Sequence, residues 1–273
     1  MTRVMAGAGA EMRIALRNRW VTIAVVMMAL FALVLSAAGS APTGQIGVDK
    51  LSVTVASLTS LAVYLVPLLA LLMSFDAVAG EIERGTLPLV LTYPVSRIEI
   101  LAGKFLAHLA VLGLAFAAGY GVAAVAAYAF DPNATEGLPA LARLFVTSLL
   151  LGAAFLGAGY AVSVLARRPG SAAGIAIGLW LVFVVLYDLG LLAAVVADGG
   201  GTFTTKVFPF LLLANPADAF RLYNLAASEA AGVASGVAGA AESIPQAWAL
   251  SSLLAWAVGG FSLAILAFRK VVP

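Results

Sequence analysis

The side chains that could do chemistry in this chain are few. It contains one histidine, His108, and no cysteine. A zinc motif of the H-E-x-x-H type, a multi-histidine metal site and any thiolate site are therefore excluded. A hydrolase triad would have to combine His108 with a serine in an apolar segment, and no neighbouring residue favours that arrangement. We expect His108 to form a hydrogen bond across a helix interface.

Binding of ATP by a P-loop is excluded as well. Gly103-Lys104 lacks both the upstream glycine and the following hydroxyl residue of that motif. The six methionines suggest a Cu(I) site, because thioether sulfur suits that ion. However, Met27 and Met28 are adjacent and point to different faces of a helix, and Met73 stands alone, so packing is the better interpretation. We predict no catalytic, cofactor-binding or metal-binding residue.

Asp188 is the one acidic residue well inside an apolar segment. This placement costs about 2.5–3.5 kcal/mol on insertion scales, so the carboxylate must face the bundle interior, water or a second copy. Burial beside a polar partner and a role in a functional pathway are both open. The same segment carries a small-residue repeat, Gly170, Gly174 and Gly178, which allows two helices to approach closely, within one chain or between two.

The elements that position these residues are membrane-spanning helices. Of 273 residues, 63% are hydrophobic and 10% charged, and the mean hydropathy is +1.08, which is too little charged surface for a soluble domain. The apolar runs are long and continuous, unlike barrel strands. The predicted fold is an all-α polytopic membrane protein, a single transmembrane domain over residues 1–273 with six transmembrane helices. The predicted spans are 20–38, 53–75, 105–130, 141–166, 171–197 and 248–268.

The basic residues orient these spans. With the N-terminus inside, only four of the 15 Lys and Arg residues lie outside, namely Lys50, Arg143, Lys206 and Arg221. The N- and C-termini are therefore predicted to be cytoplasmic. Three early arginines and the apolar run that follows also resemble a signal peptide, but residues 20–38 are long for one, so we predict an uncleaved span. Residues 1–19 form either an amphipathic surface helix or an ordinary basic flank.

The connection 76–104 combines charge with local helix signals. Residues 76–84 form a short charged helix, which Gly85-Thr86 ends, and an apolar patch follows at 87–91. Tyr93-Pro94 then turns the chain, and Ser96 with Glu99 forms a capping box. A charged and apolar surface helix between two spans is suited to docking on a cytoplasmic partner. The alternative is a solvated loop.

The outer connection 198–247 contains an apolar run, 207–214, that is broken by Pro209 and too short to span. It either re-enters the outer leaflet or packs on the outer ends of the helices. Asn215 or Asp218 is placed to cap a following helix. Aromatic and arginine side chains carry binding energy at interfaces, so we predict a periplasmic partner here, the alternative being a plug of the outer mouth. The predicted contacts are Phe210, Asn215, Asp218, Phe220, Arg221 and Tyr223.

The connection 76–104 also resembles the cytoplasmic signature of ABC-2 type permeases. The resemblance rests on Asp76, Gly80-Glu81, Glu83-Arg84-Gly85-Thr86-Leu87, Leu91, Tyr93-Pro94-Val95-Ser96-Arg97, Glu99-Ile100 and Gly103-Lys104. Residues 11–20 are similar to the elbow helix of that family, and the order of the spans agrees, so the resemblance covers the whole chain.

This resemblance implies a non-catalytic permease subunit in the bacterial inner membrane, a homodimer in the lipid bilayer with no nucleic-acid partner. ATP and Mg²⁺ would be bound by a separate cytoplasmic ATPase. The residues that would couple to it are Asp76, Glu81, Glu83, Arg84, Gly85, Thr86, Leu87, Tyr93 and Pro94. Asp188 and His108 would be the polar residues inside the membrane.

Tyr187-Asp188-Leu189 and residues 208–221 are similar to the branch of this family that serves copper-site maturation of nitrous oxide reductase. That similarity implies a NosF-like ATPase and a NosD-like periplasmic β-helical subunit. The chain would then either transmit movement from the ATPase to the periplasmic subunit or export copper or sulfur species. One alternative is an exporter permease for a lipid, drug or peptide. Another is an integral membrane enzyme, for which two polar residues inside the spans are too few.

Overall fold

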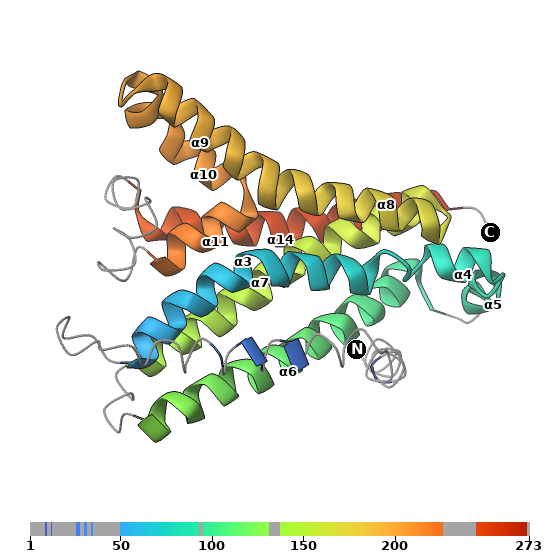
Figure 1. The fold of residues 1–273 in the computed structure, drawn as a ribbon. Helices are drawn as coiled ribbons and strands as arrows, with labels where there is room; N and C mark the ends of the chain where they lie inside the picture. Colours follow the sequence, from blue (N-terminus) through green and yellow to red (C-terminus); the bar gives the residue numbers. More distant parts are fainter. Residues whose placement is uncertain are drawn as a thin grey trace.

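The computed structural model describes residues 50–92, 95–130, 137–225 and 244–271, with isolated positions at 9, 12, 26, 27, 30, 31 and 34. This part of the chain is helical and contains no strand. Five of its helices are long and apolar enough to cross a membrane. Each of them overlaps one of the second to sixth predicted spans (Figure 1). The predicted first span, 20–38, and the predicted surface helix, 1–19, lie outside the described residues except at those isolated positions.

The long helices follow the chain in order. They are α3 (Lys50–Ser74), α6 (Arg97–Phe130), α7 (Leu138–Ala166), the continuous run of α8 (Pro169–Trp180), η2 (Leu181–Leu186) and α9 (Tyr187–Asp198), and α14 (Gln246–Arg269). The middle piece η2 is π-helical. The helix α6 begins eight residues before the predicted span because the capping box already starts it.

Short helices occupy both ends of the bundle. One end carries α4 (Ala79–Glu83) and α5 (Leu87–Leu91), and the opposite end carries η3 (Phe203–Val207), α10 (Phe208–Ala214) and α11 (Pro216–Leu225). We call these the α4 end and the α11 end. Residues 226–241, for which the sequence predicts a short helix or flexible cover, lie outside the described residues.

The helix α7 is the centre of the bundle, since its main neighbours are α14 and α3. Glycine allows the closest of these approaches. A Cβ added to Gly157 would lie 2.5 Å from backbone atoms of Gly260 and Phe261, and one added to Gly260 would lie 2.9 Å from the Ala154 carbonyl. Only a glycine pair lets two helix backbones pack this tightly, which is how helices associate in a membrane.

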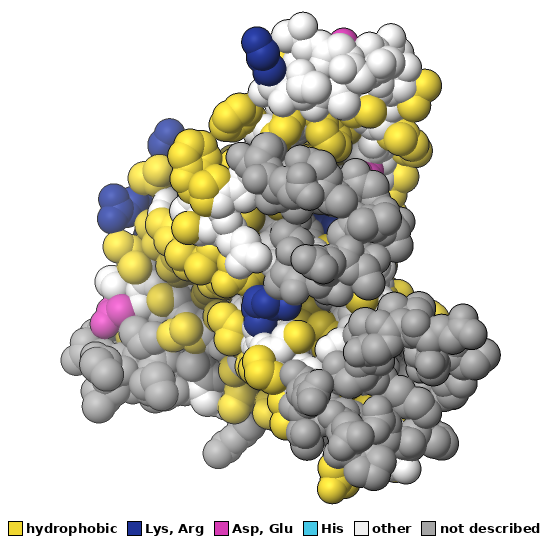
Figure 2. Space-filling model, turned by 90° about the vertical axis from the view of Figure 1, so that its left-hand side faces the viewer, with side chains coloured by type: hydrophobic (Ala, Val, Ile, Leu, Met, Phe, Trp, Pro, Cys, Tyr) yellow, Lys and Arg dark blue, Asp and Glu magenta, His cyan; other side chains and the backbone are white. Residues whose placement is uncertain are grey.

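The helix from Pro169 to Asp198, in contrast to α7, is little buried by the rest of the described chain. In its most apolar stretch 11% of the residues are buried, against 72% in α7. It runs along the margin of the bundle in Figure 1, and its outward side chains include Ile177, Leu189 and Val196. Such a face must meet lipid or another subunit. Viewed from the α11 end, the described surface also shows mostly hydrophobic and uncharged groups with isolated charges (Figure 2).

Candidate functional site

The first candidate site is the pair of short helices at the α4 end. Gly85 ends α4 in a left-handed conformation with φ of 67°, which glycine adopts without strain. The chain therefore turns at once, and Thr86, the residue before α5, donates its amide N–H to the Glu81 carbonyl over 3.0 Å. The sequence predicted the stop at Gly85 correctly, but it predicted an apolar patch where the structure has a second helix.

Three polar contacts hold α4 against the spans. The amide N–H groups of Val78 and Ala79 both donate to the Ser163 hydroxyl oxygen of α7, over 3.0 and 2.9 Å. The Lys104 ammonium of α6 lies 2.7 Å from Glu81 Oε1, and these side chains are only 7% and 13% exposed. Charges this well shielded interact far more strongly than a surface pair. The α4 helix is thus tied to two spans at once.

The outward surface of this element combines charge with one large apolar side chain. Glu83, Arg84 and Gly85 are exposed, and Leu89 on α5 is 64% exposed. Arg84 forms a loose ion pair of 3.7 Å with Asp76 across the open side of the turn. An exposed leucine on the same element as exposed charged side chains is a surface suited to docking on a partner.

The predicted coupling residues thus divide into two groups. Asp76, Glu83, Arg84 and Gly85 face outward, whereas Glu81, Thr86 and Leu87 face inward and hold the element in place. Tyr93 and Pro94 lie outside the described residues. The exposure of Leu89, the contact of Ser163 with α4 and the pairing of Lys104 with Glu81 were not predicted from the sequence.

The capping box at the start of α6 is confirmed. The Ser96 amide donates to Glu99 Oε2 over 2.8 Å, and the Glu99 amide donates to the Ser96 hydroxyl over 3.2 Å. This reciprocal pair satisfies N–H groups that the first turn of a helix leaves free. It fixes the point at which the chain turns from α5 into α6.

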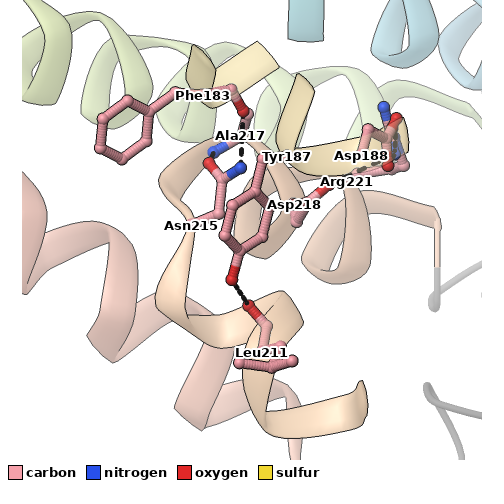
Figure 3. Close-up of polar contacts among 8 residues, drawn as sticks. All are labelled: Phe183, Tyr187, Asp188, Leu211, Asn215, Ala217, Asp218 and Arg221. Atoms are coloured by element: carbon pink, nitrogen blue, oxygen red, sulfur yellow. Dashed lines mark hydrogen bonds and ion pairs between the residues drawn. The ribbon is translucent and has the colours of Figure 1, made fainter. Parts of the chain in front are cut away.

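The second candidate site is built around α11 at the other end. Asn215 links three elements, because its Nδ2 donates to the Phe183 carbonyl in η2 over 2.6 Å and its Oδ1 accepts from the Ala217 amide over 2.9 Å (Figure 3). The second bond is the predicted cap of α11. The first bond ties the start of α11 to the π-helical piece η2. The Tyr187 hydroxyl also donates to the Leu211 carbonyl over 2.8 Å.

Asp188 pairs with Arg221 in this site. The guanidinium Nη1 lies 3.0 Å from each oxygen of Asp188 and 3.3 Å from Asp218 Oδ1 (Figure 3). Asp188 thus has a polar partner, while 36% of its side chain is exposed and faces a pocket, so both alternatives that the sequence left for it stay open. One arginine serves two carboxylates, so the cluster has one excess negative charge when all three groups are ionised.

Asp218 is the carboxylate of this cluster that is buried. Its side chain is 3% exposed, and its Oδ2 has no hydrogen-bond partner among the described residues. The pKa of Asp218 is raised to about 7, chiefly by burial; the Asp188 charge acts in the same direction, and Arg221 acts in the opposite direction. A proton on Asp218 would give the cluster a balanced charge.

A pocket of about 290 Å³ opens beside the ion pair. It lies between α3, the η2–α9 helix and α11, and its wall includes Tyr64, Leu189 and Leu192 as well as the two charged groups. Its apolar wall leaves little beyond Asp188 and Arg221 to hold a polar molecule. Among the described residues, no three His, Cys, Asp or Glu side chains are grouped to hold a metal ion.

The structure corrects the predicted partner contacts on α11. Asn215, Asp218 and Phe220 are 1%, 3% and 0% exposed, so their side chains cannot reach a partner in this conformation. The physical reason is that α11 packs into the angle between α3, α7 and α14, which buries one whole face of it. Arg221 and Tyr223 are half-buried.

Phe210 is the one predicted contact that is exposed, at 56%. Its ring centroid lies 6.3 Å from that of Trp248, which is 52% exposed at the start of α14. In the sequence, this tryptophan is distinguished only as the first residue of the last predicted span, 248–268. The aromatic pair Phe210–Trp248 is therefore one exposed apolar feature of the described part of this end.

His108 behaves as the sequence predicted. Its Nδ1 lies 2.7 Å from the Tyr160 hydroxyl of α7, in a bond that joins α6 to the central helix. The two rings also stack, with centroids 5.7 Å apart. His108 therefore has a structural role between two spans.

Comparison with known proteins places the chain among transporter subunits. The family model described as "ABC-2 family transporter protein" matches residues 5–271. A protein of Pseudomonas aeruginosa named "Probable ABC transporter permease protein NosY" is 45% identical over 264 residues, covering 95% of each chain. The protein of the same name from Stutzerimonas stutzeri is 41% identical over 274 aligned residues, covering 99% of each.

Proposed function

The chain belongs to the ABC-2 transporter family, and from this premise we propose that it couples a separate cytoplasmic ATPase to a periplasmic partner for copper-site assembly of nitrous oxide reductase. It acts as a multi-pass permease subunit of the inner membrane and carries out no reaction itself. ATP and Mg²⁺ bind to a NosF-like subunit, and a NosD-like subunit docks on the outer face. The similarity to the two permeases named NosY supports this branch of the family.

One observation carries the coupling role: the helix α7 holds both candidate sites. Its Ser163 binds the start of α4, and its Thr147 accepts a hydrogen bond of 3.0 Å from Asn224 Nδ2 of α11. These positions lie 16 residues apart on one uninterrupted helix, a distance of about 24 Å at 1.5 Å per residue. A displacement of α4 therefore moves α7 as one rigid helix, and through α7 it reaches α11.

The ATPase docks on the outward surface of α4 and α5. Leu89 inserts into an apolar pocket of the ATPase, and Glu83 and Arg84 set the orientation through charge. Since Glu81 is paired with Lys104, force on this surface reaches α6 as well as α7.

Homodimerisation uses the sparsely covered helix from Pro169 to Asp198. The repeat Gly170, Gly174 and Gly178 meets no atom within 4 Å of an added Cβ. These glycines therefore do not serve packing within the described part of the chain, and they are free for a second copy. Small residues at four-residue spacing let two such helices approach closely in lipid.

The periplasmic subunit binds the aromatic pair Phe210–Trp248. Aromatic side chains dominate binding energy at protein interfaces, and both rings are more than half exposed at the α11 end. This assignment replaces the buried Phe220 as the contact residue. The predicted exporter of a lipid, drug or peptide is the alternative, and in that case the two rings belong to the aromatic belt at the membrane surface.

The ATPase contact is tested by replacing Leu89 with glutamate. Leu89→Glu places a charge in the proposed apolar contact, and burial of an unpaired carboxylate is costly, so the ATPase subunit should be lost on purification and ATP turnover with it. The matched control is Leu138→Glu, because Leu138 is 48% exposed at the first turn of α7, where a carboxylate is tolerated. Equal retention of the ATPase by the parent chain and both variants removes α5 from the interface.

The outer contact is tested separately. Phe210→Ala with Trp248→Ala should release the periplasmic subunit and leave the ATPase bound. The control pair is Tyr128→Ala with Leu138→Ala, which removes exposed apolar surface elsewhere on the same side. If the periplasmic subunit stays bound to the first pair of variants, the exporter alternative gains.

A further inference from the structure

A groove between the ends of α7 and α14 at the α4 end has no role in the function proposed above. Its volume is about 480 Å³, and it is lined by Leu165 and Arg167 of the α7 side and by Leu263, Leu266 and Lys270 of the α14 side. The three leucines are 67%, 53% and 55% exposed. We propose that this groove binds an anionic phospholipid, with its phosphate between Arg167 and Lys270 and an acyl chain on the leucines.

Charge is the first argument. Arg167 and Lys270 are both exposed, neither forms an ion pair with a described residue, and no acidic side chain lines the groove. Two unpaired cations over an apolar trough match the shape of a phospholipid, an anion joined to hydrocarbon. Basic pockets between transmembrane helices bind such headgroups in this way.

Arg97 makes Lys270 available for this role. Its guanidinium Nη1 donates to the carbonyls of Phe268, Arg269 and Val271, the first two over 3.1 and 3.2 Å. These carbonyls lie at and just beyond the end of α14, where their partial negative charge would otherwise attract the neighbouring lysine and repel a phosphate. Because Arg97 satisfies them, the Lys270 ammonium is free to serve the groove.

The backbone at Arg167 is the second, independent observation. Arg167 caps α7 in a left-handed conformation with φ of 58°, and it is the only non-glycine residue with positive φ in the described part of the chain. Glycine would take this conformation without strain, so an arginine held there indicates a use for its side chain. The extended Arg168 and then Pro169 follow at once, which fixes the turn beside the groove.

The apolar wall favours a lipid over a soluble anion. Val164 and Val271 form its floor and are 2% and 5% exposed, while the three leucines stand on its rim. A free phosphate would use the two cations and leave this wall in water. A lipid acyl chain covers it, and the groove lies at the end of two spans, where headgroups of one leaflet are found.

The test uses the full chain with its partner subunits, purified and incorporated into bilayers of equal parts phosphatidylglycerol and phosphatidylcholine. Native mass spectrometry counts the phospholipids that each sample retains. The parent chain should retain phosphatidylglycerol in preference, and Arg167→Gln with Lys270→Gln should lower that preference about thirtyfold, since each cation contributes about 1 kcal/mol to anionic lipid binding. Inorganic phosphate should not displace the lipid.

The matched control is Arg168→Gln with Arg269→Gln. It removes the same charge from the same end of the bundle, and neither residue lines the groove, so the preference should change less than about fivefold. Equal loss in both pairs means general surface attraction and overturns the proposal, as does equal retention of both lipids by the parent chain. If the Arg167 and Lys270 variant instead falls to a monomer, the groove belongs to the dimer interface and the proposal is wrong. If that double variant does not insert, each single variant should lower the preference about fivefold, and no change in either overturns the proposal.

Discussion

The ion pair between Glu81 and Lys104 should decide whether α4 stays fixed to the spans. Lys104→Met removes the ammonium and leaves the Glu81 carboxylate 13% exposed without its partner. At 2.7 Å the two charges attract by about 6 kcal/mol in a medium of effective dielectric 20. Removing one member of a buried pair typically costs about 3–5 kcal/mol, because the other charge stays buried. We expect α4 to open more easily by an amount in that range.

The absence of cysteine makes this opening measurable. Val78→Cys replaces a side chain that is 1% exposed with a smaller one, and a maleimide can label the thiol only when α4 opens. In that background Lys104→Met should raise the labelling rate between about a hundredfold and a few thousandfold, since 1.4 kcal/mol is a factor of ten. The labelling rate of a cysteine in an unfolded peptide is the upper limit of this increase.

Two comparisons isolate the buried charge as the cause. Glu81→Gln combined with Lys104→Met leaves no buried charge and should restore most of the parent rate. Arg84→Gln removes a pair of 3.7 Å whose side chains are 60% and 44% exposed, and it should change the rate less than about fivefold. If Lys104→Met labels within about threefold of the parent chain, the ion pair does not hold α4 and the reasoning fails.

Three further predictions concern packing, pH and topology. Gly157→Ala should lower the free energy of unfolding by about 1–3 kcal/mol because its Cβ meets the α14 backbone, whereas Gly121→Ala, with open space around it, should change it by less than about 0.5 kcal/mol; equal thermal shifts in detergent would contradict the packing. Asp218 has a pKa of about 7 in the folded chain and 3.8 as its ordinary value, so the folded state binds the extra proton and stability should fall as pH rises from about 4 to 7. Asp218→Asn should remove that slope in pH-dependent unfolding, and an unchanged slope would exclude Asp218 as its source. A cysteine at Thr204 should be labelled from outside intact cells, and one at Thr86 only after permeabilisation; external labelling at Thr86 would reverse the orientation.

Local patterns in the sequence were sufficient for the five described spans and for three of the helix ends. The capping box of Ser96 and Glu99, the stop at Gly85 and the cap at Asn215 each depend on residues within a few positions of one another. The same holds for the five described spans, because continuous apolar runs of this length form helices in a membrane. These features need no knowledge of the tertiary packing.

Contacts between distant residues could not be predicted in this way. Asp188 was correctly expected to need a partner or water, but Arg221 lies 33 residues further on and meets it only because α11 folds back between the spans. The same packing buries Phe220, which the sequence analysis took for a partner contact. A signal was available, since Ala217, Phe220 and Asn224 recur at helical spacing and all three are buried.

The measurement that tests the central proposal most directly is the copper content of nitrous oxide reductase made in cells that carry each variant. With the parent chain and with Leu138→Glu, the reductase should contain its full copper. With Leu89→Glu, which breaks the proposed ATPase contact and leaves the rest of the chain intact, it should be deficient in copper. Fully metallated reductase from cells whose Leu89→Glu chain is inserted but has lost the ATPase would contradict the proposed coupling.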